Sequence, residues 1–405
     1  MSTSSIIVPA ASRLHFIPPG FVTPDVAVTP EVSQMLASNC VVAVGVSGGK
    51  DSMACAIATN EHLNRIGHVG PRLLIHSDLG RVEWKDSLPA CERLAAHLGW
   101  ELMVVRRAAG DMLARWEGRW ANNVARYLDL ECVKIILPWS TPAMRFCTSE
   151  LKTSVICSAL RKRFPKEDIL NVVGIRREES ENRRRMPVSA TLAKLARRNA
   201  KGVSWNSIIE LTIEEVFATI AKAGVSLHEA YGVYGSSRVS CVACIMSSLP
   251  DLIAATRCLD NIPLYIQMVE LEALSTFAFQ GTRWLADVAP EHLSAELLTR
   301  VADAKRRALE RQTIESELPK HLLYTAGWPT CIPSVEEAEL IASVRRRIAG
   351  LMGFQAKYLT ANDVRARYAE LLSAKPAGAT TEEAPPELMD MLPCGGQLSL
   401  FQDAA

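Results

Sequence analysis

Runs and periodic patterns of apolar residues divide the first two thirds of the chain into alternating strands and helices. Residues 40–46 (Cys-Val-Val-Ala-Val-Gly-Val) form a continuous apolar run, which is typical of a buried parallel strand. Similar runs predict strands at residues 72–77, 101–106 and 169–174. Helical patterns occur at residues 31–38, 50–65, 84–98, 107–128 and 149–164. This alternation predicts an α/β fold with a doubly wound parallel sheet, which binds ligands at the carboxyl ends of its strands.

The last third of the chain shows only helical patterns, at about residues 262–280, 291–316, 334–352 and 361–373. Residues 374–396 contain many Pro, Gly and Ala residues and few core residues, which is typical of a flexible tether. We therefore predict four parts: an N-terminal extension at 1–35, an α/β domain at 36–255, an all-helical domain at 256–373 and a flexible tail at 374–405.

Composition places the chain among globular proteins. It has 405 residues, of which 48% are hydrophobic and 22% charged, and this excludes a mostly disordered chain, a collagen-like repeat and a small disulfide scaffold. The formal net charge is only +1, so any attraction to nucleic acid must come from local clusters. We find no signal-peptide pattern and no apolar run near the ~18–20 residues of a membrane span. The expected location is cytoplasmic, without membrane association.

A glycine-containing loop, Ser47-Gly-Gly-Lys-Asp-Ser52, follows the strand predicted at 40–46 and opens a helix. Two glycines allow a sharp turn and a close approach to an anion, and the N–H groups of a helix N-terminus favour negative charge. Lys50 adds a positive charge, and the serine hydroxyls add donors. Asp51 would repel a phosphate, and it suggests either a helix cap or a bridging Mg²⁺ ion. The alternative interpretation is a plain glycine turn.

The loop resembles the PP-loop of the ATP pyrophosphatases, which split ATP between its α and β phosphates. Four further segments narrow the resemblance to the branch of these enzymes that is similar to phosphoadenosine-phosphosulfate (PAPS) reductase. These segments are His76-Ser-Asp-Leu-Gly80, Phe146-Cys-Thr-Ser-Glu-Leu-Lys152, residues 173–180 with Arg183, and residues 207–216. The resemblance covers about residues 35–255, and its elements occur in the family's order.

The resemblance implies ATP and Mg²⁺ as ligands and a PP-loop sheet as the fold. It places the nucleotide on a set of residues around the strand ends: Ser47, Gly48, Gly49, Lys50, Asp51, Ser52, Asp78, Arg176 and Arg183. The expected catalytic residues are Ser47, Lys50, Asp51 and Lys152.

Cys241 and Cys244 form a Cys-x-x-Cys pair after a glycine-containing turn, a spacing that suits one metal ion or an iron–sulfur cluster. Zinc, or two buried core thiols, are the alternatives. By resemblance, Cys147, Cys241 and Cys244 would hold a [4Fe–4S] cluster, with Cys258, another cysteine or a non-protein group as the fourth ligand. The cysteines at 40, 55, 91, 132 and 157 fall in strand or helix patterns, and we predict that they are core residues.

The cysteine pattern looks closest to the ATP pyrophosphatase and sulfurtransferase component of bacterial DNA phosphorothioation systems. We therefore expect ATP-dependent sulfur transfer, with DNA as the acceptor and a sulfur donor such as a cysteine desulfurase. The first alternative is a sulfonucleotide reductase, which needs a tail cysteine between Glu and His; Cys394 lacks both neighbours. The second alternative is a DNA-associated adaptor that binds nucleotide without sulfur chemistry.

Basic residues are concentrated in residues 172–202, which hold nine Lys and Arg residues and three Glu residues. Arg176 and Arg183 would bind ligand phosphate, and the later residues would contact a nucleic-acid backbone. The alternative for residues 184–201 is a solvated, partly disordered loop. Trp205 would either stack on a base or pack in the core.

The chain ends in an apolar cluster, Gln397-Leu-Ser-Leu-Phe401, which follows the predicted tether. Its large apolar groups would be exposed to water unless a partner covers them. The segment resembles the pentapeptide that binds the bacterial β sliding clamp. We therefore expect Gln397, Leu398, Leu400 and Phe401 to bind that clamp; the alternative is that the tail docks on its own domain.

Overall fold

The computed structural model describes residues 17–375, which form two compact units. Unit 1 contains residues 17–112 and 147–263, and unit 2 contains residues 113–146 and 264–375. Within the described residues, no helix combines the length and the apolar character that crossing a membrane would require. The tail residues Gln397, Leu398, Leu400 and Phe401 lie outside the described part of the chain.

Unit 1 is built on a six-stranded sheet with the order β3-β2-β1-β4-β6-β5. The strands are β1 (Val41–Val46), β2 (Arg72–Asp78), β3 (Glu101–Arg106), β4 (Ile169–Val172), β5 (Ser189–Thr191) and β6 (Gly202–Trp205). All neighbouring pairs are parallel except β5 with β6. The predicted α/β fold is confirmed, with one antiparallel strand at the edge of the sheet.

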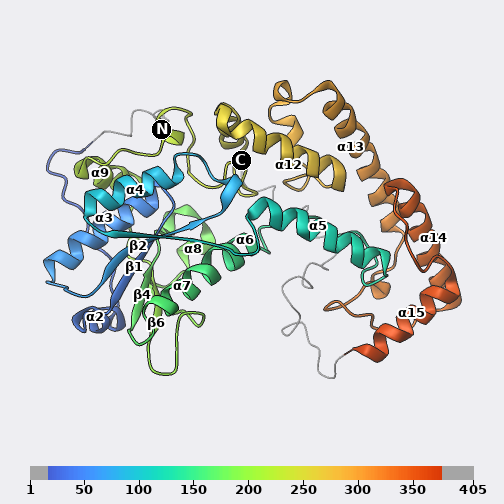
Figure 1. The fold of residues 1–405 in the computed structure, drawn as a ribbon, viewed down its shortest axis with the longest axis horizontal. Helices are drawn as coiled ribbons and strands as arrows, with labels where there is room; N and C mark the ends of the chain where they lie inside the picture. The colour runs from blue at the N-terminus through green and yellow to red at the C-terminus, as the bar shows by residue number, and fades with distance from the viewer. Residues whose placement is uncertain (1–16, 376–405) are drawn as a thin grey trace, which may run out of the picture. The chain divides into compact units, whose positions relative to one another are not determined.

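Helices cover both faces of this sheet. One face packs against α2 (Pro30–Ala37), α3 (Lys50–Arg65), α4 (Ser87–Leu98) and α9 (Ile213–Ala223), through alternate residues of β1 such as Val42 and Val44. The other face, which includes Val41 and Ala43, packs against α7 (Val155–Arg163) and Leu195. Figure 1 shows α3, α4 and α9 grouped on one side of the strands and α7 apart from them. Since β1 contributes to both cores, it is the centre of the unit.

The two last strands of the sheet, which no sequence pattern predicted, lie within the basic segment 172–202 and at its end. Both are short, at Ser189–Thr191 and Gly202–Trp205, and too brief for a periodic pattern to reveal. Trp205 is fully buried, and its indole N–H donates to the carbonyl oxygen of Ala27 at 2.7 Å. Trp205 is therefore a packing residue and not a platform for a base.

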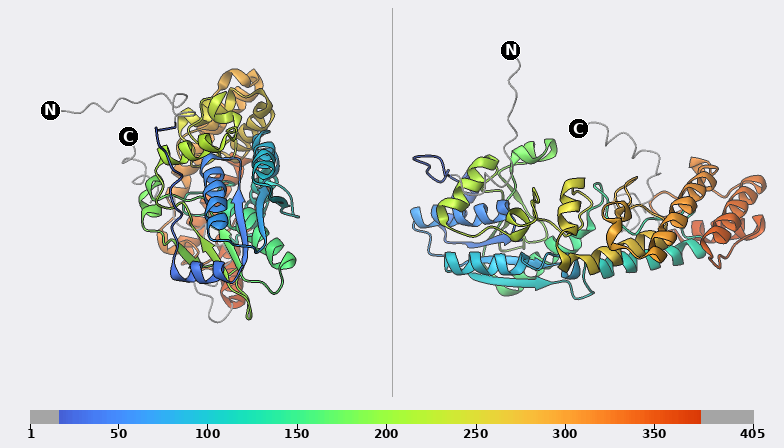
Figure 2. Two further views of the ribbon diagram at one scale, coloured as in Figure 1. Left: turned by 90° about the vertical axis from the view of Figure 1, so that its left-hand side faces the viewer. Right: turned by 90° about the horizontal axis from the view of Figure 1, so that it is seen from above.

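Unit 2 is helical, as predicted for the C-terminal region. Its helices are α5 (Met112–Leu128), α12 (Ile262–Ser275), α13 (Ala295–Ser316), α14 (Val335–Met352) and α15 (Ala361–Ala374). In Figures 1 and 2 the teal α5 runs beside the gold and orange helices of this unit. The rings of Trp116 and Trp120 contact those of Phe279 and Phe277, respectively.

The division into units therefore differs from the predicted boundary at residue 255. Residues 113–146 group with the C-terminal helices, although they follow β3 directly in the sequence. The reason is that the aromatic side chains of α5 find their partners beyond residue 264. Because buried aromatic rings contribute strongly to packing, these contacts decide which unit α5 joins.

The cysteines predicted as core residues are buried: Cys40, Cys55, Cys91, Cys132 and Cys157 are all at most 5% exposed. That prediction is confirmed.

Candidate functional site at the carboxyl edge of the sheet

The order of the strands places a switch point between β1 and β4. Strands β2 and β3 lie on one side of β1 in the sheet, and strands β4 and β6 lie on the other side. In doubly wound sheets the loops at such a point diverge and leave a crevice outside the carboxyl ends of the strands. Here the loop 47–49 follows β1 and residues 173–176 follow β4, so both predicted phosphate-binding segments flank the switch point.

The loop 47–49 leads into α3 through a closed turn. Gly49 is the N-cap residue of α3, and Gly48 has a φ of +74°, which favours glycine. A Cβ atom at Gly48 would lie 3.0 Å from the carbonyl oxygen of Ser87. The hydroxyl of Ser52 donates to the Gly49 carbonyl at 2.8 Å and accepts from the N–H of Ser47 at 3.3 Å. The turn is thus closed by two hydrogen bonds, and the N-terminus of a 16-residue helix opens onto it.

Lys50 lies between this turn and the segment that carries Cys241 and Cys244. Its side chain is buried, and its Nζ atom lies 3.2 Å from Asp51 Oδ2 and 3.4 Å from the carbonyl oxygen of Ser237. The same ammonium sits 5.6 Å from the centre of the Tyr231 ring. The Lys50 charge is therefore held in place from three directions.

Asp51 joins the two strand-end segments. Arg176, which is only 3% exposed, donates from Nε to Asp51 Oδ1 at 2.7 Å and from Nη1 to Glu178 Oε2 at 2.5 Å. Burial alone would raise the pKa of Asp51, but the charges of Lys50 and Arg176 outweigh it and lower the pKa below its usual value. Asp51 is therefore ionised between two cations, and it does not act as the side-chain cap of α3.

Gly174 allows this close approach of the segments after β1 and β4. A Cβ atom at Gly174 would lie only 2.6 Å from the carbonyl oxygen of Asp51.

Arg183, by contrast, lies one step away from the loop. It forms an ion pair with Glu179, and Glu179 accepts the backbone N–H of Arg176 at 3.0 Å. The structure thus places Arg176 beside the loop, and it connects Arg183 to the loop only through other residues.

Asp78 lies at the end of β2, where sequence analysis placed a nucleotide contact. Its carboxylate accepts the N–H of Gly80 at 2.7 Å and the Nε–H of Arg106 at 3.0 Å. Burial would raise the pKa of Asp78, but these donors lower it overall. The carboxylate therefore shapes the turn after β2.

His76 is a site residue that sequence analysis did not assign. It is 1% exposed and lies 3.0 Å through Nδ1 from the carbonyl oxygen of Val46, and 3.1 Å through Nε2 from Glu83 Oε2. Burial would lower its pKa, but the hydrogen bonds with Cys91 and Glu83 raise it to about 10. A protonated His76 donates to both oxygens and fixes the last residue of β1, directly before the loop. His76 directly follows the apolar residues 73–75 of β2, and a titratable side chain at the end of such a run is the signal for it in the sequence.

Asp251 organises the segment that holds the cysteine pair. It lies on α11 (Leu249–Thr256), is 6% exposed, and accepts the N–H of Ser237 at 2.7 Å. The hydroxyls of Ser236, Ser237 and Ser248 donate to the same carboxylate. Burial would raise the pKa of Asp251, and these donors lower it overall. One buried carboxylate thus ties both ends of the segment 236–248.

Tyr231 joins this cysteine segment to the phosphate loop, and sequence analysis did not assign it either. Its hydroxyl oxygen accepts the N–H of Lys50 at 3.0 Å and the N–H of Val239 at 3.2 Å. The ring is 4% exposed, on the short helix α10 (Glu229–Gly232). One oxygen atom therefore sets the spacing between the first residue of α3 and the approach to Cys241.

Cys147 and Lys152 lie near the cysteine pair. Cys147 belongs to the short helix α6 (Phe146–Thr148), and Lys152 to the π-helical turn Ser149–Ser154 that follows it. Burial raises the pKa of Cys241 to about 12, with Cys244 and Cys147 acting in the same direction and Lys152 in the opposite one. Short π-helical turns are frequent at functional sites, and no sequence pattern predicts where one will form.

The donors expected for an iron–sulfur cluster are thus neighbours, but they do not form a metal site as they stand. Within residues 17–375, no group of three or more His, Cys, Asp or Glu side chains is arranged to hold a metal ion. Cys258, the candidate for a fourth ligand, is buried and 2% exposed. Thiolate chemistry suits iron or zinc, yet these side chains would have to converge before they bound either metal.

No family model matches the chain. The chain is similar to a protein of Escherichia phage 186 described as an "Uncharacterized 37.8 kDa protein in gpa 5'region". The two are 26% identical over 257 residues, which is 54% of this chain and 71% of the phage protein. Because that description gives no activity, any function must rest on the residues of the site.

Proposed function

We propose that the chain is an ATP pyrophosphatase that activates an acceptor, for which we propose DNA, for the insertion of sulfur. The observation that carries the proposal is the closed glycine turn at the switch point, where the N-terminus of α3 opens beside the buried cations of Lys50 and Arg176. Helix N–H groups and buried cations are the groups that stabilise a pyrophosphate as it leaves.

In the proposed reaction an oxygen atom of the acceptor attacks the α phosphorus of ATP. The bond from that phosphorus to the oxygen bridging to the β phosphate breaks, and pyrophosphate leaves. Sulfide then forms a bond to the acceptor, and AMP departs with the former acceptor oxygen. The sulfide would come from a donor such as the persulfide of a cysteine desulfurase, reduced by a thiol.

The residues of the loop would bind and orient the β and γ phosphates. Backbone N–H groups at the turn and the Ser47 hydroxyl would donate to phosphate oxygens, and Lys50 would neutralise charge that builds up on the leaving group. Asp51 keeps Lys50 and Arg176 in position through its two ion pairs. Because both Asp51 oxygens are engaged, we expect Mg²⁺ to enter with ATP on its phosphate oxygens.

The test is the identity of the products. Purified protein is incubated without oxygen with MgATP, sulfide and duplex DNA, and AMP, ADP, pyrophosphate and phosphorothioate are measured. We expect AMP and pyrophosphate, and an about 10- to 100-fold slower release for Ser47→Ala, since one positioned donor is lost. Ser38→Ala is the matched control, because that serine caps the far end of α2. ADP and phosphate as the products, or full turnover in Ser47→Ala, would exclude the mechanism.

The sulfonucleotide reductase alternative shares the same loop and cysteines. It is distinguished by replacing ATP and DNA with PAPS and a thioredoxin-type reductant. Release of sulfite from PAPS in that mixture, together with no release of pyrophosphate in the separate assay with ATP and DNA, would favour the reductase.

A further inference from the structure

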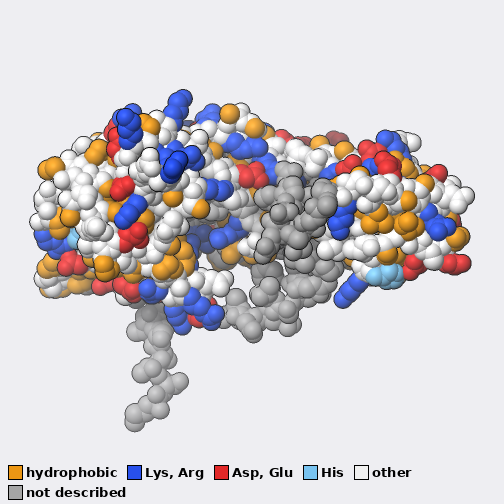
Figure 3. Space-filling model, turned by 90° about the horizontal axis from the view of Figure 1, so that it is seen from below, with side chains coloured by type: hydrophobic (Ala, Val, Ile, Leu, Met, Phe, Trp, Pro, Cys, Tyr) orange, Lys and Arg blue, Asp and Glu red, His pale blue; other side chains and the backbone are white. Residues whose placement is uncertain are grey.

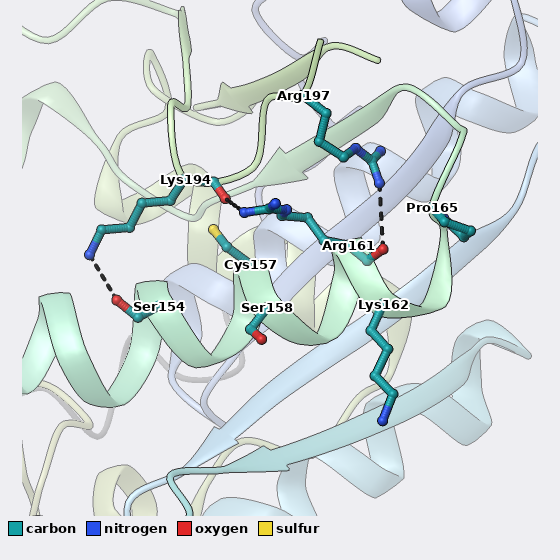
Figure 4. A pocket seen from close by; sticks show the side chains of 8 residues that line it. All are labelled: Ser154, Cys157, Ser158, Arg161, Lys162, Pro165, Lys194 and Arg197. Atoms are coloured by element: carbon teal, nitrogen blue, oxygen red, sulfur yellow. Dashed lines mark hydrogen bonds between the residues drawn. The ribbon is translucent and has the colours of Figure 1, made fainter. Parts of the chain in front are cut away.

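A basic groove lies on unit 1, between α7 and the segment that follows β5. It has a volume of about 580 Å³ and is lined by Ser154, Cys157, Ser158, Arg161, Lys162, Pro165, Lys194 and Arg197. Figure 4 shows Lys194 and Arg197 reaching over α7 from one side, with Arg161 and Lys162 on the helix itself. Two distant stretches of the chain therefore build one concave surface.

The cations of this groove are not neutralised by carboxylates. Its lining contains Arg161, Lys162, Lys194 and Arg197 and no acidic residue. Among the ion pairs of residues 17–375, none involves these four side chains. Their hydrogen bonds go to neutral groups: Lys194 donates to the Ser154 hydroxyl at 2.8 Å, and Arg197 to the carbonyl oxygens of Phe164 and Glu167.

The first five cations of the basic segment behave differently. Arg176, Arg177, Arg183, Arg184 and Arg185 each form an ion pair with a glutamate. The surface drawn in Figure 3 likewise shows Lys and Arg side chains interspersed with Asp and Glu side chains, in keeping with a net charge of +1. Of the nine cations of residues 172–202, Lys194 and Arg197 are the two that line the groove, and neither is paired with a carboxylate there.

The shape of the groove favours an extended polyanion over a single phosphate group. Ser154 and Lys162 are eight residues apart on one helix, which corresponds to about 12 Å. A nucleic-acid strand rises about 3.4 Å per nucleotide, so several successive phosphates would lie along that length. The lining contains no aromatic residue on which a base would stack.

We propose that this groove binds the sugar–phosphate backbone of a nucleic acid without reading its bases. One end of the groove, at Ser154, lies two residues after Lys152, so a bound strand would run toward the cysteine side of the site. The proposal deepens the proposed function, and it rests on that function for the choice of DNA among nucleic acids.

The test is DNA binding by the full chain, measured by fluorescence anisotropy with a labelled 20-base-pair duplex over a series of salt concentrations. The variant is Arg161→Ala with Lys162→Ala, two exposed residues whose loss should leave the fold intact, as a thermal melt would verify. We expect about tenfold weaker binding at low salt and a salt slope lower by about 2, since two phosphate contacts are lost. Duplexes of unrelated sequence should bind alike.

The matched control is Arg306→Ala with Arg346→Ala, which removes the same charge from two exposed arginines of unit 2 that pair with Asp303 and Glu339. We expect this control to bind DNA as the wild type does. The proposal is wrong if the wild type does not bind, if the groove variant binds with unchanged affinity and slope, or if the control loses as much. If the wild type binds DNA through the groove but releases no AMP, the groove proposal is supported and the proposed ATP chemistry is wrong. If the wild type releases AMP but the groove variant binds DNA normally, the ATP chemistry is supported and the groove proposal is wrong.

Discussion

Tyr231→Phe removes a hydroxyl oxygen that connects the loop 47–52 to the cysteine segment. The hydroxyl oxygen accepts the N–H groups of Lys50 and Val239, at 3.0 and 3.2 Å. The ring stays, so the packing of Tyr231 against Phe217 is kept. The substitution therefore tests two hydrogen bonds and little else.

The size of the expected loss of stability follows from the burial of the Tyr231 hydroxyl. Tyr231 is 4% exposed, so water does not readily replace the lost acceptor. A buried donor left without a partner costs about 1–3 kcal/mol, and two donors are affected. Some of this cost is recovered because the buried hydroxyl itself no longer has to be desolvated. We expect the free energy of unfolding of unit 1 to fall by about 2–4 kcal/mol.

The assay is hydrogen exchange followed by mass spectrometry, combined with urea unfolding, because a chain of two units need not unfold in one step. Peptides that cover residues 47–52 and 236–244 should exchange faster in Tyr231→Phe. The control is Tyr265→Phe in unit 2, whose hydroxyl accepts the N–H of Ala289 at 3.2 Å. That variant should lose comparable stability and leave both unit 1 peptides unchanged.

The reasoning is refuted if Tyr231→Phe unfolds at the same urea concentration as the wild type and both peptides exchange at the wild-type rate. Faster exchange in only one of the two peptides would show that the hydroxyl holds that segment alone.

Three further predictions concern other parts of the site and the tail. Folding raises the pKa of His76 from 6.5 to about 10, so the stability that its protonation gives the folded state is complete below pH 6.5 and is lost as the pH rises toward 10. The urea midpoint should therefore fall over that pH range in the wild type and much less in His76→Gln. Asp251→Ala should lower the melting temperature and reduce the iron content of anaerobically purified protein, since four hydrogen bonds to the cysteine segment are lost; an unchanged iron content would contradict the role given to Asp251. Leu400→Ala with Phe401→Ala in a tail peptide should abolish the heat of binding to a bacterial β clamp, and a wild-type peptide that gives no heat at several hundred micromolar, against the expected ~micromolar affinity, would remove the clamp as a partner.

The sheet and the glycine turn at residues 47–49 were predictable because their signals are local. A continuous apolar run at residues 40–46 requires burial on both faces, and the two glycines that follow it mark the turn into the next helix. The bounds predicted for the strand at 101–106 match β3. By contrast, Tyr231 acts on Lys50 from 181 residues away, and Arg176 acts on Asp51 from 125 residues away. Such partners follow from the topology, and a single sequence contains no distance information.

Two other features escaped prediction for different physical reasons. The strands β5 and β6 are three and four residues long, which is shorter than the pattern needed to recognise a strand. The helix α5 has a clear pattern, but the pattern does not say which surface its apolar face will contact. Its partners in unit 2 decided that question.

The interrupted path of the chain through unit 2 has a consequence for synthesis on the ribosome. Helix α5 is complete at Leu128, whereas the body of α12 is made only after residue 264. At ~5–20 residues per second, roughly 7–27 s pass between these events. During that interval Trp116 and Trp120 lack the rings they later cover, and chaperones would be expected to shield them. A chain truncated near residue 263 would keep this exposed helix permanently, so the α/β unit should be prone to aggregate when produced alone unless residues 113–146 are also removed.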